Sequence, residues 1–541
     1  MSCPLLNLHA ELQYLIFQHL QSYKNLEGQD VQNVKPLHRD RLLGEQDIFE
    51  RDLRNLSLTC SFYYVTLLPY TFKRLALQNN ETSASSILRC MTNTERNYVQ
   101  FTKELCFTDT RAMALAMEDK HFGHSHRKNS SKKDNRNDIN IPELCRLPTS
   151  AAEVLSNLSR FPNLDHLLIH WRFHDSDWYI EKYIIDYDTE DVNGVAEREA
   201  QAPWRALMRD VYNAVSKNVV DINTSTSPAA SSISSPPQAD LLQSPTMPPI
   251  LKSLEIKNIP MNPVSTYLSP TFHNFLSTLR SFKLSLMTAD NIGHYAINTC
   301  HQYHEFVYKL DEYFLNHLSS ATSLHISAWD GPLGGEEDAG PSYCPCSLPP
   351  ARIPVLKRLA LDNCFTTAPG LINFLVAHAR SLERVEFFRC FSDNDGNTWC
   401  KLFDALARAG PKWLVEFCVE PGEVKFREES YRKNEENERE AGRCQALLGG
   451  DEDEDETEGE CVVGEGRGVA GRRGRRAFCY GYIDDKYGFV NELSCTNREM
   501  FLRGEDQRAY DTLMEIVEQN RKRLMGAESG IFNHITPPLG H

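Results

Sequence analysis

Long apolar runs are missing from this chain of 541 residues. No stretch approaches the roughly 18 apolar residues that a membrane-spanning helix needs, and no basic segment followed by an apolar one begins the sequence. Cysteine is sparse as well, because 16 cysteines over this length are too dilute for a disulfide scaffold. These absences predict a soluble protein of a reducing compartment, the cytoplasm or the nucleus, with no membrane partner.

An excess of positive charge is the second absence. The chain has 58 Lys and Arg residues against 74 Asp and Glu residues, a net charge of -16 at pH 7. A protein that binds duplex nucleic acid needs a basic surface for the phosphates, so we do not expect nucleic acid as the main partner. One basic run, residues 472–476, leaves open the weaker hypotheses of nuclear import and RNA contact.

Catalytic motifs are the third absence. Residues 466–471 have the spacing of a dinucleotide fingerprint but lie between an acidic and a basic run, without a strand before them. Residues 393–396 begin like a calcium loop, yet no glutamate closes it. Cys344 and Cys346, and the histidines within 121–126, lack the second ligand pair of a zinc site. We therefore expect no enzyme activity, no cofactor and no metal.

Composition divides the chain into parts. Four segments are too polar, or too rich in Ser, Pro or charge, to pack into a core. They are a flexible loop at 121–138, a Ser/Pro-rich linker at 221–249, a loop at 331–350 and a disordered acidic and basic segment at 421–479. After the last of them, residues 480–541 regain order, with a docking helix at 506–523 that places Tyr510, Leu513, Met514 and Val517 on one face.

Between these segments a pattern of the form Leu-x-x-Leu-x-Leu recurs. Its six instances are Leu164/Leu167/Ile169, Leu251/Leu254/Ile256, Leu279/Phe282/Leu284, Ala321/Leu324/Ile326, Leu356/Leu359/Leu361 and Leu382/Val385/Phe387. Two of the spacings between successive instances, 28 and 26 residues, match the length of a leucine-rich repeat. The other spacings, 87, 42 and 35 residues, contain insertions. Helical stretches precede most instances, so the pattern predicts an α/β fold in which strand and helix units stack into an irregular solenoid. An ordinary α/β domain with coincident leucines is the alternative.

These repeats occupy residues 78–220 and 250–420 and should form one sheet. Alternate positions of each strand point to opposite faces, so the residues between the leucines form a second, polar face. Aromatic and arginine side chains on such a face are typical of protein-binding surfaces, although a merely solvated face is the simpler interpretation. The candidates for target binding are His325, Arg358, Asp362, Arg384, Glu386 and Phe388.

Residues 1–77 have a different pattern. Apolar residues repeat at helical spacing on both sides of a polar insertion at 21–51, with Pro69 expected to stop the second helix and Phe72 and Leu75 to lie in a third. Phe17 lies outside the apolar stripe of the first helix, so a partner protein would best cover it. The candidates for partner binding are Leu8, Leu12, Ile16, Phe17, Leu20, Leu53, Leu56, Cys60 and Pro69.

This N-terminal pattern resembles an F-box, and the order of the segments resembles F-box proteins of the filamentous-fungal type with degenerate leucine-rich repeats. The resemblance implies a three-helix unit that binds a Skp-family adaptor and, through it, the cullin of an SCF-type ubiquitin ligase. The repeats would then bind an unknown protein target. A leucine-rich scaffold that joins no ligase is the alternative function, and an RNA-associated protein acting through residues 472–476 is a third.

Overall fold

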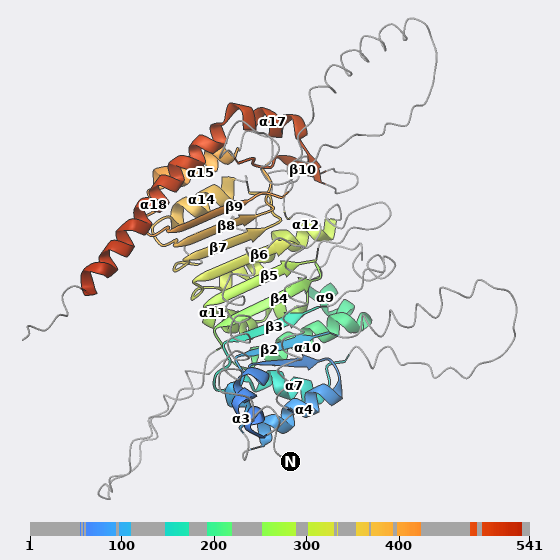
Figure 1. Ribbon diagram of the computed structural model, residues 1–541. Helices are drawn as coiled ribbons and strands as arrows, with labels where there is room; N and C mark the ends of the chain where they lie inside the picture. Colours follow the sequence, from blue (N-terminus) through green and yellow to red (C-terminus); the bar gives the residue numbers. More distant parts are fainter. Residues whose placement is uncertain are drawn as a thin grey trace, which may run out of the picture. The chain divides into compact units, whose positions relative to one another are not determined.

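The protein is described by a computed structural model (Figure 1). It describes Asn55, Leu58, residues 61–93, 97–109, 146–171, 192–218, 251–287, 301–328, Leu333, and residues 353–366, 369–392, 398–422, 476–483 and 490–532. Most of the candidate partner-binding residues fall outside these ranges: Leu8, Leu12, Ile16, Phe17, Leu20, Leu53, Leu56 and Cys60. The predicted segments at 121–138 and 221–249 also fall outside them.

A parallel sheet with the strand order β1-β2-β3-β4-β5-β6-β7-β8-β9 organises the fold, which is therefore α/β. Its strands are β1 (Arg74–Gln78), β2 (Glu104–Thr108), β3 (His166–His170), β4 (Ser253–Ile259), β5 (Ser281–Leu286), β6 (Ser323–Ala328), β7 (Arg358–Asp362), β8 (Arg384–Phe388) and β9 (Glu416–Glu420). A separate antiparallel pair consists of β10 (Gly481–Ile483) and β11 (Val490–Glu492). The six strands predicted from the leucine pattern are β3 to β8, while β1, β2 and β9 were not predicted.

Helical segments connect the strands. The α-helices are α3 (Ser61–Thr71), α4 (Glu81–Thr92), α7 (Thr149–Ser156), α9 (Val192–Gln201), α10 (Pro203–Ser216), α11 (Pro270–Thr278), α12 (His301–Tyr308), α13 (Leu310–Tyr313), α14 (Pro369–His378), α15 (Trp399–Ala409), α17 (Ser494–Arg503) and α18 (Glu505–Phe532). The 3-10 helices are η3 (Tyr98–Phe101), η4 (Leu158–Arg160), η5 (Ser265–Leu268) and η7 (Leu315–His317). No described helix combines the length and the apolarity that a bilayer crossing requires.

The chain divides into two compact units. Among the described residues, the first unit holds α3, β1, α4, η3, β2, α7 and the chain up to Leu168. Its two complete strands are parallel, with Leu75 opposite Leu105 and Leu77 opposite Phe107. Leu77, Leu105 and Phe107 are fully buried, because alternate apolar residues of a strand share one face.

Two expectations for this unit were wrong. The helix expected to stop at Pro69 continues to Thr71 with Pro69 inside it, because a single missing amide donor removes one hydrogen bond and the last turn still forms. Leu75 lies in β1 rather than in a third helix, since pairing with β2 satisfies its backbone groups. The predicted boundary after residue 77 therefore falls inside β1.

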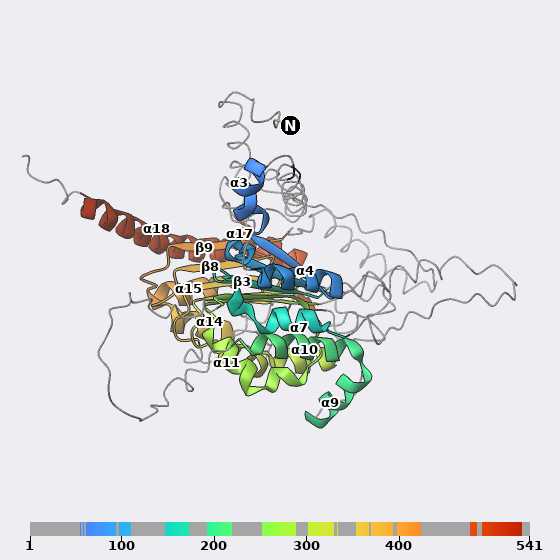
Figure 2. The same cartoon turned by 90° about the horizontal axis from the view of Figure 1, so that it is seen from below.

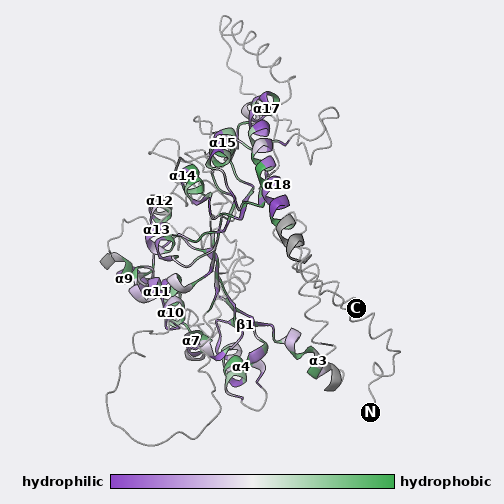
Figure 3. Ribbon diagram, turned by 90° about the vertical axis from the view of Figure 1, so that its left-hand side faces the viewer, coloured by the Kyte–Doolittle hydropathy of each residue, from purple (hydrophilic) through white to green (hydrophobic). Residues whose placement is uncertain are grey.

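The second unit begins at the end of β3 and contains β4 to β9 with the helices between them. Figures 2 and 3 show α10, α11, α14 and α15 on one side of these strands. The alternate residues of β4, β5 and β6 that face the helices are buried. Aromatic rings fill this layer; the ring centroids of Tyr267 and Phe314, for example, are 4.8 Å apart.

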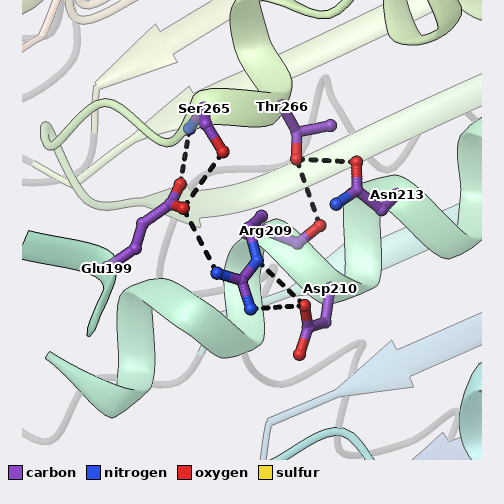
Figure 4. A network of polar contacts seen from close by, with 6 residues as sticks. All are labelled: Glu199, Arg209, Asp210, Asn213, Ser265 and Thr266. Atoms are coloured by element: carbon purple, nitrogen blue, oxygen red, sulfur yellow. Dashed lines mark hydrogen bonds and ion pairs between the residues drawn. The ribbon is translucent and has the colours of Figure 1, made fainter. Parts of the chain in front are cut away.

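A buried polar network ties α9 and α10 to η5 (Figure 4). The carboxylate of Glu199, 3% exposed, accepts a hydrogen bond from the backbone N–H of Ser265 at 2.5 Å and another from its hydroxyl at 3.0 Å. Arg209 pairs with the same carboxylate at 3.3 Å, and the hydroxyl of Thr266 donates to the backbone carbonyl of Arg209. Each buried polar group is thus satisfied, which is the condition for such a network to stabilise the fold.

The C-terminal helix α18 packs on α15 and on β9, the last strand of the sheet. It buries Tyr510, Leu513 and Val517. Its polar side chains reach the end of the sheet, where Asn520 Nδ2 donates to two backbone carbonyls and Arg521 donates to the carbonyl of Val415. These acceptors lie in the segment just before β9, so the helix fixes the chain where it enters the last strand.

Candidate functional site

The face of β4 to β9 opposite the helices, called the polar face below, is built from residues in aligned rows. The parallel register sets one residue of each strand directly beside its neighbour. The first row is Ser253, Ser281, Ser323, Arg358, Arg384 and Glu416, and the second is Glu255, Lys283, His325, Ala360, Glu386 and Cys418. A third row follows over the five strands β5 to β9: Ser285, Ser327, Asp362, Phe388 and Glu420. All six candidate target-binding residues are brought together on this face.

These six residues are less exposed than expected for a binding surface. Arg358 is exposed and His325 is half-buried, but Asp362, Glu386 and Phe388 are buried, at 8%, 4% and 8% exposed. The part of the polar face formed by β8 and the end of β7 is thus largely buried, whereas Glu420 of β9 is exposed.

Ion pairs link the charged residues of this part of the face. Arg384 Nη2 lies 2.6 Å from Glu386 Oε1, and its Nη1 lies 3.0 Å from Glu416 Oε2, so one guanidinium bridges two strands. Arg389, just past β8, donates to Asp362 at 2.8 and 2.9 Å. The backbone of Arg389 has a φ of 49°, a left-handed conformation that costs a non-glycine residue roughly 1 kcal/mol. Its pairing with Asp362 helps to hold this conformation.

Cys418 lies in the second row beside these charges. Burial raises the pKa of its thiol to about 11, with Glu420 and two further carboxylates adding to the rise and Arg476 opposing it. A thiol with such a pKa is protonated at neutral pH and is a poor nucleophile. Among the described residues, no group of three or more His, Cys, Asp or Glu side chains is arranged to hold a metal ion.

The candidate partner-binding surface is represented by one described residue, Pro69, which is exposed on α3. Other apolar side chains of this stretch of the sequence are exposed as well: Leu58 at 81%, Val65 at 63% and Tyr70 at 44%. Tyr64 OH and Tyr98 OH lie 2.6 Å apart and Phe72 stacks on Tyr98, which holds the end of α3 to η3. The structure therefore leaves an apolar group of side chains accessible on this part of the first unit.

Sequence reasoning missed two structural features of the second unit. It did not find β9, although Leu414, Phe417 and Val419 have the same spacing as the other strands. It also missed Arg389, because no local pattern shows that a residue after β8 pairs with Asp362 on the neighbouring strand β7. No family model, curated protein or solved structure matches this chain.

Proposed function

We propose that the chain is the substrate-recognition subunit of an SCF-type ubiquitin ligase. Residues 1–77 would bind a Skp-family adaptor and through it a cullin, and the polar face would bind a protein target. The subunit would carry no catalytic residues, because it would act by holding the target close to the conjugating enzyme. The observation that carries the target-binding half is the polar face, where a parallel ladder aligns polar residues from six consecutive strands, with charged residues on all of them except β6.

We further propose that the strand and helix units are degenerate leucine-rich repeats. The repeat consensus continues past its third leucine to an Asn or Cys at the ninth position. Counting from Leu356 and from Leu382, the ninth positions are Cys364 and Cys390, and both are buried. The thiol of Cys364 lies 3.4 Å from the carbonyl of Asp362, and that of Cys390 lies 3.3 Å from the carbonyl of Phe388. This equivalence supports a repeat.

The adaptor-binding half rests on the sequence pattern of residues 1–77 and is tested by Ile16→Asp in the full chain. A carboxylate on the apolar stripe of the first helix costs several kcal/mol when a partner buries it, so pull-down of the adaptor should be lost. Val376→Asp is the matched control, because Val376 is 40% exposed on α14, a helix of the second unit, and its variant should retain the adaptor.

Retention of the adaptor by a folded Ile16→Asp chain would count against the F-box interpretation. Failure of the unaltered chain to bind any Skp-family adaptor would favour the scaffold alternative instead. Circular dichroism of both variants establishes that the fold is intact.

A further inference from the structure

The polar face is divided by charge along the sheet. Over β4, β5 and the start of β7, three cations (Lys257, Lys283 and Arg358) accompany a single carboxylate, Glu255. Within β8 and β9 the balance is reversed, because Glu386, Glu416 and Glu420 accompany Arg384; one further cation, Arg476, donates to the Val419 carbonyl of β9. This division is not apparent from the order of charges along the chain, and follows only from the strand register.

The two ends also differ in how their charges are engaged. Arg384 at the acidic end contacts two carboxylates at 2.6 and 3.0 Å. At the basic end, Glu255 is shared by Lys257 at 3.2 Å and Lys283 at 3.9 Å. Arg358 is exposed and has no ion-pair partner among the residues that the structure describes. Positive charge at the basic end is therefore only partly neutralised.

The side chains between these cations are small hydroxyls. Five serines of β4, β5 and β6 lie on this part of the face, and all are half-buried: Ser253, Ser281, Ser285, Ser323 and Ser327. Ala360, which is buried, continues the second row into β7 with another short side chain. Long basic side chains thus stand beside short hydroxyls, an arrangement that offers hydrogen-bond donors and charge to an anion lying across the strands.

We infer that the basic end of the polar face, formed by Lys257, Lys283, Arg358 and the serines between them, docks an extended acidic segment of a partner protein. This inference rests on the proposed function, since it specifies the kind of target that the proposed receptor binds. From β4 to β7 is three strand spacings, about 14 Å, and an extended chain covers this span with about five residues at roughly 3.3 Å each. Several carboxylates of one such segment can therefore meet all three cations.

Other polyanions fit less well. A single phosphate group cannot contact cations that are spread over four strands, so a peptide with one phosphorylated side chain uses only part of the site. Single-stranded nucleic acid is bound through aromatic platforms for its bases, and the described residues on this part of the face are Ser, Lys, Glu, His, Arg and Ala. Charge complementarity without aromatic platforms favours an acidic peptide.

The test is fluorescence anisotropy with the full chain and a labelled ten-residue peptide of alternating Glu and Ser. The same peptide with Gln in place of Glu should bind at least tenfold more weakly, and added salt should weaken binding of the Glu peptide. The double variant Lys283→Glu with Arg358→Glu should lose at least tenfold in affinity, because like charges then oppose each other across the site.

The matched control is Lys401→Glu with Arg408→Glu. It changes the net charge equally but lies on exposed positions of α15, so binding should change by less than about twofold. If the double reversal on the face misfolds by circular dichroism, Lys283→Gln with Arg358→Gln removes the charges without repulsion and should weaken binding in the same direction.

Four results would overturn the inference. The first is equal binding of the Glu peptide by the unaltered chain and the face variant. The second is tighter binding of a Gln/Ser peptide that carries one phosphoserine than of the Glu peptide, and the third is binding of a ten-nucleotide oligouridine as tight as that of the Glu peptide. The fourth is a several-fold gain of affinity for the Glu peptide on deleting residues 451–460, which would make the chain's own acidic run the occupant. No adaptor is present in this assay. Acidic-peptide binding by a chain that fails to bind the adaptor would leave the inference standing and remove the ligase function.

Discussion

Removing Arg384 should cost much more stability than its place on a sheet surface indicates. Its partner Glu386 has a side chain that is 6% exposed, and the guanidinium 2.6 Å away compensates for that burial. Breaking a buried pair from one side costs about 3 to 5 kcal/mol, because the remaining charge is left desolvated. The Arg384 side chain keeps 20% exposure, so we expect a loss of about 2 to 4 kcal/mol for Arg384→Met.

The reverse deletion should cost less. In Glu386→Leu, Arg384 keeps its contact with Glu416 at 3.0 Å, whose side chain is 43% exposed, so the cost should be near 1 kcal/mol. The double variant, Arg384→Met with Glu386→Leu, removes both charges together and should also cost about 1 kcal/mol. The two changes should therefore be strongly non-additive, with a coupling of at least about 1.5 kcal/mol.

Native-state hydrogen exchange over β8 measures this coupling, since a chain with two compact units is poorly described by one global unfolding transition. The expected loss for Arg384→Met corresponds to a fall in amide protection of roughly thirtyfold to a thousandfold. The reasoning is refuted if Arg384→Met leaves protection unchanged. It is refuted equally if the double variant is as poorly protected as Arg384→Met, because Glu386 would then not be the cause.

Two further predictions concern the C-terminal helices. Burial raises the pKa of Asp506 above its usual 3.8, although Tyr480 OH and the Cys400 N–H donate to it, so the folded chain keeps this proton in a pH range where the unfolded chain has lost it. The contribution of Asp506 to stability should therefore fall as pH rises through that range. The difference in melting temperature between the unaltered chain and Asp506→Asn should change from about pH 4 upward. A difference that stays constant with pH would contradict the raised pKa of Asp506. Asn520→Leu should cost about 1 to 3 kcal/mol of stability, seen as faster hydrogen exchange in α18, because the carbonyls of Pro411 and Leu414 lose their donor. Gln519→Leu changes an exposed position and should leave the exchange rates unchanged. Equal exchange rates in both variants would contradict the role of Asn520.

The sequence predicted the strands better than it predicted their surface. Each of β3 to β8 has apolar residues two positions apart and a third residue three positions before them, and this spacing alone places the buried side of a strand. Leu75 was predicted in a helix but lies in a strand, because the local pattern is equally compatible with a helix and with the strand pairing to Leu105. The choice depends on a strand 30 residues away in the sequence.

The chemistry of the polar face depends on register, which local patterns do not contain. From the sequence alone, Glu386 is expected to be an exposed charge, whereas in the fold it lies beside Arg384, which also contacts Glu416. The division into a basic and an acidic end likewise requires knowing that Arg358 lies beside Ser323 and Arg384. Glu199 is a third example, because its partner Ser265 lies 66 residues further along the chain.

Quantitative co-purification from cells tests the central claim that one chain carries two separate binding surfaces. The chain would be expressed unaltered, as Ile16→Asp, and as Lys283→Glu with Arg358→Glu, and its bound proteins would be measured by mass spectrometry. The account predicts that Ile16→Asp loses the Skp-family adaptor and cullin but keeps its targets. The face variant should keep the adaptor and lose targets that have acidic segments. Loss of both classes in both folded variants, or retention of the adaptor by Ile16→Asp, would contradict the account.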